Sequence, residues 1–299
     1  MAGKVTVTYY HHSGFSVAAG RTLMVFDYWR GDENWHLPKE CELTKADFAP
    51  FDQVLVFISH DHPDHFDEIV YTFDKWDVPV TYVVSHDFPI GKSGRRMKVG
   101  DQITVGDAAV TAYPSTDKGV SFLVEAGGVR IFHAGDLNLW HWREESELFE
   151  IMDAERQFEE AMETLVNVPM DLCFFPLDPR MGGLFDAGAN HFLWSVKPRV
   201  FIPMHWYGRS EVAREYARKS RTKYTETLAL TAPREKVEID FGPNTLTVRT
   251  FQAQPLRSRT YASPVQEKES DPFQAVNPFM DSDLPVSLDA QAPADKNHQ

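Results

Sequence analysis

Cysteine is scarce in this chain of 299 residues, since only Cys41 and Cys173 occur, far apart in the sequence. Neither has a neighbouring cysteine or histidine at metal-ligand spacing, which excludes a disulfide framework and a CxxC redox centre. Cys173 lies in the apolar run DLCFFPL, and this setting indicates a buried structural thiol rather than a nucleophile. We therefore expect chemistry that does not use a thiol.

Long apolar runs are also missing. No stretch approaches the roughly 18 consecutive apolar residues of a membrane span. The N-terminal sequence MAGKVTVTYYHH has no apolar signal region. These absences predict a cytoplasmic protein without a membrane span.

Basic residues are outnumbered, with 30 Lys and Arg against 44 Asp and Glu and a formal net charge of −14. Such a chain is repelled by nucleic acid and by anionic membranes unless its basic residues cluster. The one basic cluster, within residues 214–221, is typical of a solvated helix face. We expect a small-molecule substrate and no nucleic acid. A homo-oligomer stays open, because symmetric interfaces leave little trace in one sequence.

Hydrophobic patterning predicts an α/β fold. Helices are predicted at residues 67–75, 143–166 and 186–196 and from Ser210 onward, and a loop at residues 177–184. Short β-rich runs fill most of the remaining sequence: KVTVTYY, FSVAA, TLMVFDY, QVLVFIS, VTYVVS, AAVTAY, VSFLVEA, VRIFHA, residues 171–176, residues 199–203, KVEIDF and TLTVRTF. Two sheets with helices outside are favoured over a doubly wound parallel sheet.

The composition changes near residue 250. Residues 251–299 contain six prolines, no glycine and little hydrophobic periodicity. This composition is typical of a disordered tail. We predict one folded domain over residues 1–250 and a disordered C-terminal tail over residues 251–299.

The densest group of metal-binding side chains is SHDHPDHFD at Ser59–Asp67, directly after the apolar run QVLVFI. Histidines two apart in an extended loop present their rings to one side, so His60 and His62 can bind one cation. Asp64 and His65, beyond the proline, can reach a neighbouring cation. Helix capping is a poorer explanation, because a cap needs one oxygen acceptor rather than three imidazoles. The segment therefore predicts a metal site.

Two later residues also follow β-rich runs. Asp136 ends FHAGD and His205 lies in FIPMHW. Each is a weak signal alone, since Gly-Asp after a strand is commonly a turn. Together with the histidine-rich segment they predict further ligands. The cofactor is expected to be a divalent metal, one or two Zn²⁺, with Mn²⁺ or Fe²⁺ as alternatives because His and carboxylate suit several metals.

At this point the sequence resembles the metallo-β-lactamase superfamily, whose HxHxDH motif is matched by His60, His62, Asp64 and His65. Asp136 and His205 match the later Gly-Asp and strand-end His of that family. A closer likeness, to the branch of ascorbate-6-phosphate lactonase-like proteins and N-acyl-phosphatidylethanolamine phospholipase D, is carried by four short features. These features are HSGF at His12–Phe15, Asp27, HAGD at His133–Asp136 and PMHW at Pro203–Trp206.

The resemblance implies an αββα sandwich of two mixed β-sheets, with the metals at the sheet edge. One departure matters: many family members have a further metal-binding His where this chain has Ser115 in PSTDKG. His86, His133 or His141 are candidates to replace it, and the number of metals stays open.

Metal-bound water loses its proton near pH 7, which supplies hydroxide as the nucleophile. Asp64 is expected to bind a metal and to orient that hydroxide. His12, His133 and His141 are candidates to protonate the leaving group, because histidine titrates nearest neutrality.

Substrate contacts are expected from three further places. Arg180, in DPRMGG, can bind an anionic group with two hydrogen bonds. His141 and Trp206, together with Trp140 and Trp142, are candidates for the substrate-binding rim. The acidic, Trp-containing segment at residues 139–166 is either a lid over the site or a helix packed on the sandwich.

The function that the sequence favours is metal-dependent hydrolysis of an ester, lactone or phosphate ester of a small metabolite. A metal-dependent phosphodiesterase or nuclease is one alternative, disfavoured by the acidic balance. A di-iron redox protein is another, although related flavodiiron proteins have Glu where this chain has His62. A non-catalytic metal-binding protein is the third, suggested by Ser115 and the tail.

Overall fold

The computed structural model describes residues 3–88, 94–142, 145–251 and 259–262. The chain divides into the units Met1–Pro264 and Val265–Gln299, and every described residue lies in the first. The predicted disordered tail therefore lies largely outside the described residues. Its described part, Arg259–Ala262, forms a short strand where the sequence predicted none.

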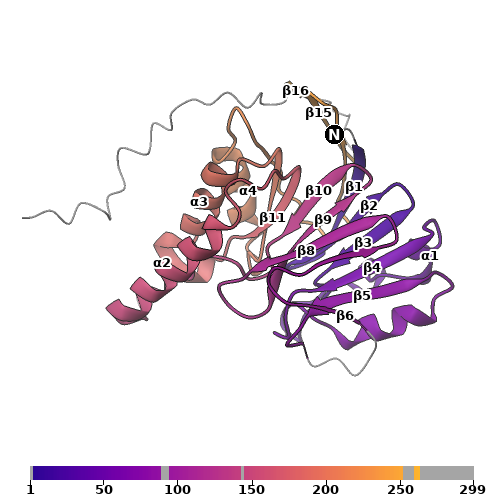
Figure 1. The fold of residues 1–299 in the computed structure, drawn as a ribbon, viewed down its shortest axis with the longest axis horizontal. Coiled ribbons are helices and arrows are strands. Elements are labelled where there is room, and N and C mark those ends of the chain that lie inside the picture. Colours follow the sequence, from indigo (N-terminus) through magenta and orange to yellow (C-terminus); the bar gives the residue numbers. More distant parts are fainter. Residues whose placement is uncertain (1–2, 89–93, 143–144, 252–258, 263–299) are drawn as a thin grey trace, which may run out of the picture. The chain divides into compact units, whose positions relative to one another are not determined.

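Two mixed β-sheets build the described unit (Figure 1). The first has nine strands in the order β16-β15-β14-β1-β2-β3-β4-β5-β6. Its strands β3 to β6 run parallel, and its other neighbours are antiparallel. The bounds are β1 Gly3–His11, β2 Gly14–Ala19, β3 Thr22–Phe26, β4 Gln53–Ile58, β5 Val80–Ser85, β6 Arg95–Met97, β14 Lys236–Phe241, β15 Thr245–Thr250 and β16 Arg259–Ala262.

The second sheet has seven strands in the order β13-β12-β11-β10-β9-β8-β7. Strands β10 to β13 run parallel, whereas β7 to β10 are antiparallel. The bounds are β7 Gln102–Val105, β8 Ala108–Pro114, β9 Val120–Ala126, β10 Val129–His133, β11 Leu172–Pro176, β12 Val200–Met204 and β13 Glu226–Thr227.

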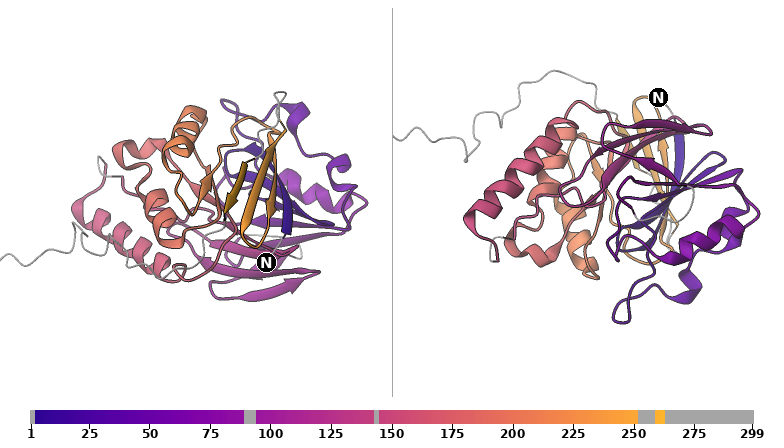
Figure 2. Two further views of the ribbon diagram at one scale, coloured as in Figure 1. Left: turned by 90° about the horizontal axis from the view of Figure 1, so that it is seen from above. Right: turned by 60° about the horizontal axis from the view of Figure 1, so that its bottom comes forward.

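Helices flank the two sheets. Figures 1 and 2 show α2, α3 and α4 together on one side of the sandwich and α1 on the other. The helices are α1 Lys45–Phe48, α2 Leu148–Glu163, α3 Ala187–Val196 and α4 Ser210–Lys219, with 3-10 helices η1 Lys39–Cys41, η2 Glu68–Lys75 and η3 Pro179–Leu184. This arrangement confirms the predicted αββα sandwich. The segment predicted as a loop at residues 177–184 is largely η3, and α2 is shorter than the predicted helix.

Strand β4 shows how the sandwich is packed. Leu55 and Phe57 face one hydrophobic cluster, and Val54, Val56 and Ile58 face another. Alternate residues of a strand point to opposite faces, so both faces of this sheet are buried. The first cluster fills the space between the sheets and continues under α3 and α4, and the second lies under α1 and η2. The unbroken apolar run QVLVFI is the sequence counterpart of this double burial.

Several strands end at the same edge of the sandwich. In the first sheet β1, β3 and β4 run in the same direction, and in the second sheet β8, β10, β11 and β12 do so. The loops that follow these strands hold the residues that the sequence predicted as metal ligands.

Among the described residues, none of the helices has the length and apolar character that a membrane span requires.

Candidate metal centre

The side chains of the candidate centre come from loops at the carboxyl ends of strands in both sheets. Three of these residues have a left-handed backbone: His12 with φ of 51°, Asp27 with φ of 39° and His205 with φ of 60°. Non-glycine residues seldom adopt this conformation, which costs about 1–3 kcal/mol and persists where the surroundings fix it. Here the sharp turn at the strand end directs each side chain into the site.

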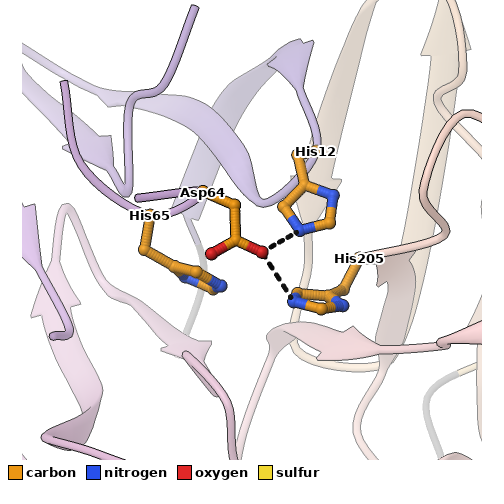
Figure 3. A group of neighbouring side chains, drawn as sticks. All are labelled: His12, Asp64, His65 and His205. Carbon is orange, nitrogen blue, oxygen red and sulfur yellow. Dashed lines mark ion pairs between the residues drawn. The ribbon is translucent and has the colours of Figure 1, made fainter. Parts of the chain in front are cut away.

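One group of possible ligands surrounds Asp64 (Figure 3). Asp64 Oδ2 lies 3.2 Å from His12 Nε2 and 3.7 Å from His205 Nε2. The ring of His65 belongs to the same group. Three imidazoles, from the loops after β1, β4 and β12, thus meet one carboxylate, although His12 and His205 lie almost two hundred residues apart in the sequence.

Asp136 joins this group to a second one. Its Oδ1 lies 2.9 Å from His65 Nε2 and 3.4 Å from His205 Nε2. Its Oδ2 lies 3.2 Å from His60 Nε2 and 3.8 Å from His62 Nδ1. The two oxygens of one carboxylate therefore face two different sets of histidines. This is the arrangement that a carboxylate bridging two neighbouring metal ions requires.

The unpaired atoms of the site test whether it fits a metal. His12 Nε2, His60 Nε2, His65 Nε2, His205 Nε2 and Asp136 Oδ1 are buried and make no hydrogen bond among the described residues. Yet the four ring nitrogens all lie within ion-pair distance of a carboxylate oxygen. Tetrahedral ligands about 2.0–2.2 Å from zinc stand about 3.3–3.6 Å apart. The spacings of 2.9–3.8 Å bracket that range, so the residues fit a divalent cation.

A layer of hydrogen bonds behind the ligands fixes which ring nitrogen each histidine presents. The Ser59 hydroxyl donates to Asp27 Oδ2 at 2.6 Å, so it accepts from Nδ1 of His60 at 2.9 Å. Nδ1 of His65 lies 2.8 Å from the same Asp27 oxygen. With their protons on Nδ1, both rings turn the lone pair of Nε2 toward the site, as metal binding requires.

The electrostatics favour a cation. Burial opposes charge on Asp136, but the neighbouring His65 and His205 hold the pKa of that carboxyl well below its usual range. Burial also raises the pKa of Asp64, but the neighbouring His12 and His65 lower it below its usual range. Burial and the neighbouring His205 lower the pKa of His12 to about 3, so this imidazole is neutral near pH 7. Burial opposes charge on His65, but Asp136 and Asp27 raise the pKa of this imidazole well above its ordinary value. Metals bind ionised carboxylates and neutral imidazoles, so a cation that binds His65 displaces a proton.

The centre opens into a cavity of about 640 Å³. Its wall includes Asp64, Asp136 and His205, so the ligand groups are accessible from the cavity. Arg180 also lines it, and Arg180 Nε and Nη2 are held by Asp178 at 3.0 Å and 2.5 Å. The remaining lining residues are Trp29, Asp32, His62, Pro63, Thr116, Asp117, Trp140, Trp142 and Tyr207.

Some predicted site residues lie away from this cavity. His133 is fully buried, stacks on Phe26 and pairs through Nε2 with Ser13 O at 3.0 Å. His141 Nε2 lies 3.1 Å from Glu155 Oε1. Trp206 is buried and its ring packs against the rings of Tyr9 and Trp35. None of the three is among the described residues that line the cavity, whereas Trp140 and Trp142 are.

The predicted lid segment has two parts. Trp140 and Trp142 line the cavity, and Trp140 Nε1 donates to Asp136 O at 2.9 Å. Helix α2 buries Phe158 and Met162 in the core and therefore packs on the sandwich. Helix α2 thus fits the alternative of a helix packed on the sandwich, and the lid stays a prediction.

Several residues of the site were not among the predicted site residues. Asp27 and Asp178 each follow a strand, Ser59 precedes the histidine motif, and Asp117 and Tyr207 lie in loops. The signal for Asp27 and Asp178 was available, because both are carboxylates directly after β-rich runs. Asp117 and Tyr207 carry no such signal in a single sequence.

Comparison with known proteins is consistent with this geometry. Residues 25–206 match the beta-lactamase superfamily domain. A protein of Heliobacterium modesticaldum named "UPF0173 metal-dependent hydrolase" is 27% identical over 229 residues, which cover 67% of this chain and 82% of that protein. A protein of the same name from Nitratidesulfovibrio vulgaris is 24% identical over 245 residues, covering 76% and 88% of the two chains.

Solved structures with the same fold include Igni18, a metallo hydrolase from Ignicoccus hospitalis. Its TM-score is 0.59 at 18% identity, covering 80% of this chain and all of that one. The chain belongs to the metallo-β-lactamase superfamily. Its ligand groups and its relatives make it a metal-dependent hydrolase of that superfamily. The closer likeness to the ascorbate-6-phosphate lactonase-like branch stays a prediction.

Proposed function

We propose that this hydrolase cleaves an ester, lactone or phosphate ester of a small metabolite that carries an anionic group. The observation that carries the proposal is the set of ligand groups around Asp64 and Asp136, joined by the contacts of Asp136 with His65 and His205, which opens into one cavity beside Arg180. Divalent metals held there lower the pKa of bound water to about 7 and polarise a carbonyl or phosphoryl oxygen. Zn²⁺, Mn²⁺ and Fe²⁺ all suit these ligands.

Some residues of the site would hold the metals, and others would bind the substrate. His60, His62 and Asp136 would hold one metal, and Asp64, His65 and His205 the other, with Asp136 shared. His12 contacts Asp64 within the group around that carboxylate, which places it with the metal-binding residues. We do not assign the leaving-group proton to His133 or His141, because neither lines the cavity among the described residues.

Arg180 is suited to bind the anionic group of the substrate. Its guanidinium lies 3.9 Å from the centroid of the Tyr207 ring and is fixed by Asp178. Its Nη1 makes no hydrogen bond within the described part of the chain and remains available as a donor. An arginine held in this way loses little conformational freedom on binding, which favours recognition of a carboxylate or phosphate.

The aromatic wall favours a small substrate. Trp29, Trp140, Trp142 and Tyr207 line the cavity together with four carboxylates. Indole rings can cover an apolar part of the substrate and exclude water from the reacting bond. A cavity of about 640 Å³ has the size of ordinary small-molecule sites. Its acidic lining also disfavours nucleic acid as the substrate.

The test combines metal content with hydrolysis. Wild type and Asp64→Asn are purified without added metal, and their metals are measured by elemental mass spectrometry. Hydrolysis of p-nitrophenyl esters, lactones and bis-p-nitrophenyl phosphate is then followed with and without Zn²⁺ or Mn²⁺. Asp52→Asn serves as the control, because Asp52 is an exposed surface residue paired with Arg21.

We expect about two metals per wild-type chain, turnover of at least one substrate class, and loss of both a metal and the turnover in Asp64→Asn. Metal-replete wild type that turns over none of the three classes would contradict the proposed reaction. Failure of wild type to bind metal after reconstitution would contradict the proposed site as well.

A further inference from the structure

The first metal site lacks the third histidine that many members of its family have, and among the described residues no other histidine supplies it. His86 is exposed, His133 contacts Ser13, and His141 contacts Glu155. None of the three belongs to a ligand group among the described residues. The group around His62 is completed instead by a second carboxylate, that of Asp117.

We propose that Asp117 is a direct ligand of the metal that His60, His62 and Asp136 hold, in place of the missing imidazole. Asp117 Oδ2 lies 3.6 Å from His62 Nδ1, and Asp136 Oδ2 lies 3.8 Å from the same nitrogen. His60 Nε2, which is buried and without a hydrogen bond among the described residues, faces that Asp136 oxygen at 3.2 Å. This inference rests on the proposed metal site.

The loop that carries Asp117 is fixed on both sides. Thr116 Oγ1 donates to Asn138 O at 2.5 Å, next to the loop of Asp136. Lys118 Nζ lies 3.2 Å from Asp61 Oδ1, between His60 and His62. Asp117 is therefore held between the two loops that supply the other ligands.

Gly119 allows the same loop to approach the histidine motif closely. Its φ is +72°, and a Cβ at this position would lie 1.9 Å from Ser59 O and 2.8 Å from His60 Cβ. Val120 N donates to Ser59 O at 3.2 Å across this contact. Only glycine combines that backbone conformation with that proximity. The loop is thus packed directly on the residues of the first metal site.

A rival role for Asp117 is to orient His62 from behind. An orienting carboxylate binds the ring nitrogen that does not face the metal. Here Asp117 and Asp136 approach the same nitrogen, Nδ1 of His62. If Asp136 and His62 bind one metal, Asp117 faces the metal side of that ring. The geometry therefore favours ligation over orientation.

A carboxylate in place of an imidazole changes which metal the site prefers. Carboxylates suit harder cations such as Mn²⁺, whereas imidazole suits Zn²⁺. The two sites of this chain would then differ. The group around Asp64 has three imidazoles and one carboxylate, whereas the group of His62, Asp117 and Asp136 has one imidazole and two carboxylates. We expect the first site to favour Mn²⁺ over Zn²⁺ more strongly than the second does.

Metal binding by the full chain tests this directly, without reference to turnover. Metal-free wild type, Asp117→Asn, Asp117→His and Asp52→Asn are titrated separately with Mn²⁺ and with Zn²⁺ by calorimetry. Metal content is measured after equilibrium dialysis. Asp52 is the control, because it is an exposed carboxylate paired with Arg21 and belongs to no ligand group among the described residues. Circular dichroism of the metal-free forms establishes that each variant is folded.

We expect Asp117→Asn to weaken the first site by more than about 100-fold in Kd, since loss of an orienting group costs only about 10–100-fold. Asp117→His is expected to bind two metals per chain, as wild type does, and to shift the metal preference of the first site toward Zn²⁺. A smaller loss in Asp117→Asn, an equal loss in Asp52→Asn, or an unchanged preference in Asp117→His would overturn the assignment. Wild type that binds no metal would instead overturn the proposed function.

Discussion

Asp178 Oδ2 lies 3.2 Å from Nδ1 of His205, while Nε2 of that ring faces Asp64 and Asp136. Asp178 is fully buried, and its pKa is lowered, against the effect of burial, by His205 and Arg180. A carboxylate on the far nitrogen of a metal-binding histidine fixes the tautomer and raises the basicity of the ring. Asp178 therefore supports His205 from behind, as Asp27 supports His65.

Replacing Asp178 with Asn is expected to weaken the second metal site by about 10–100-fold, because the ring of His205 loses its anionic partner. Calorimetric titration of metal-free protein with Zn²⁺ measures the change. Asp178 contacts both His205 and Arg180, so Arg180→Gln serves as a comparison. It removes the guanidinium and leaves the Asp178 carboxylate beside His205. Unchanged Zn²⁺ affinity in Asp178→Asn would show that this contact has no role in metal binding.

Arg180→Gln is expected to weaken the binding of anionic substrates in particular. It should raise KM at least about tenfold for an anionic ester and leave a neutral ester of the same leaving group nearly unaffected, because only the first offers a partner for the guanidinium. Steady-state kinetics on such a pair of esters measures the difference. Arg209→Gln is the control, since Arg209 is exposed and paired with Glu211. Equal changes for both esters would argue against anion recognition.

Gly119→Ala is expected to destabilise the protein by roughly 3 kcal/mol or more, through backbone strain and overlap with Ser59 O. Two controls separate these causes. Gly20 has φ of +58°, and a Cβ added there would meet nothing within 4 Å, so Gly20→Ala should cost about 1 kcal/mol from strain alone. Gly183 has open space and no positive φ, so Gly183→Ala should change little. Urea unfolding of metal-free protein measures all three, and equal costs at Gly119 and Gly20 would contradict the close contact.

The ion pair of Asp47 with Arg234 gives a pH-dependent prediction. Burial raises the pKa of Asp47, but hydrogen bonds from Arg234 and Thr44 lower it below its ordinary value. A group whose pKa is lower in the folded state stabilises above its unfolded pKa of about 3.9, and this contribution is lost as the pH falls through the folded value. Asp47→Asn should therefore cost about 1–2 kcal/mol at pH 7 and much less near pH 3.

Urea unfolding of metal-free wild type and Asp47→Asn at the two pH values checks this. Metal-free protein is used because metal release at low pH would otherwise add to the change. The control is Asp52→Asn, whose fully exposed ion pair should contribute little at either pH. A difference between wild type and Asp47→Asn that stays constant with pH would contradict the role of the carboxylate charge.

The sequence by itself determined the class of the protein and most of its ligand candidates. Short β-rich runs separated by turn residues predicted most of the strands, and the apolar run QVLVFI marked the strand that precedes the histidine motif. His60, His62, Asp64 and His65 lie within one short loop, so their spacing alone indicated a metal site. Local patterns were sufficient wherever the physical cause was local.

Only the tertiary structure decided which distant residues meet. His133, His141 and Trp206 are as suitable by type as His205 or Trp140, yet strand direction and packing place them away from the cavity. Asp117 stands beside His62 because β8 and β4 end at the same edge of the sandwich, in different sheets. A single sequence does not encode that proximity as a local pattern. It arises from the register and stacking of two sheets, which the whole core determines.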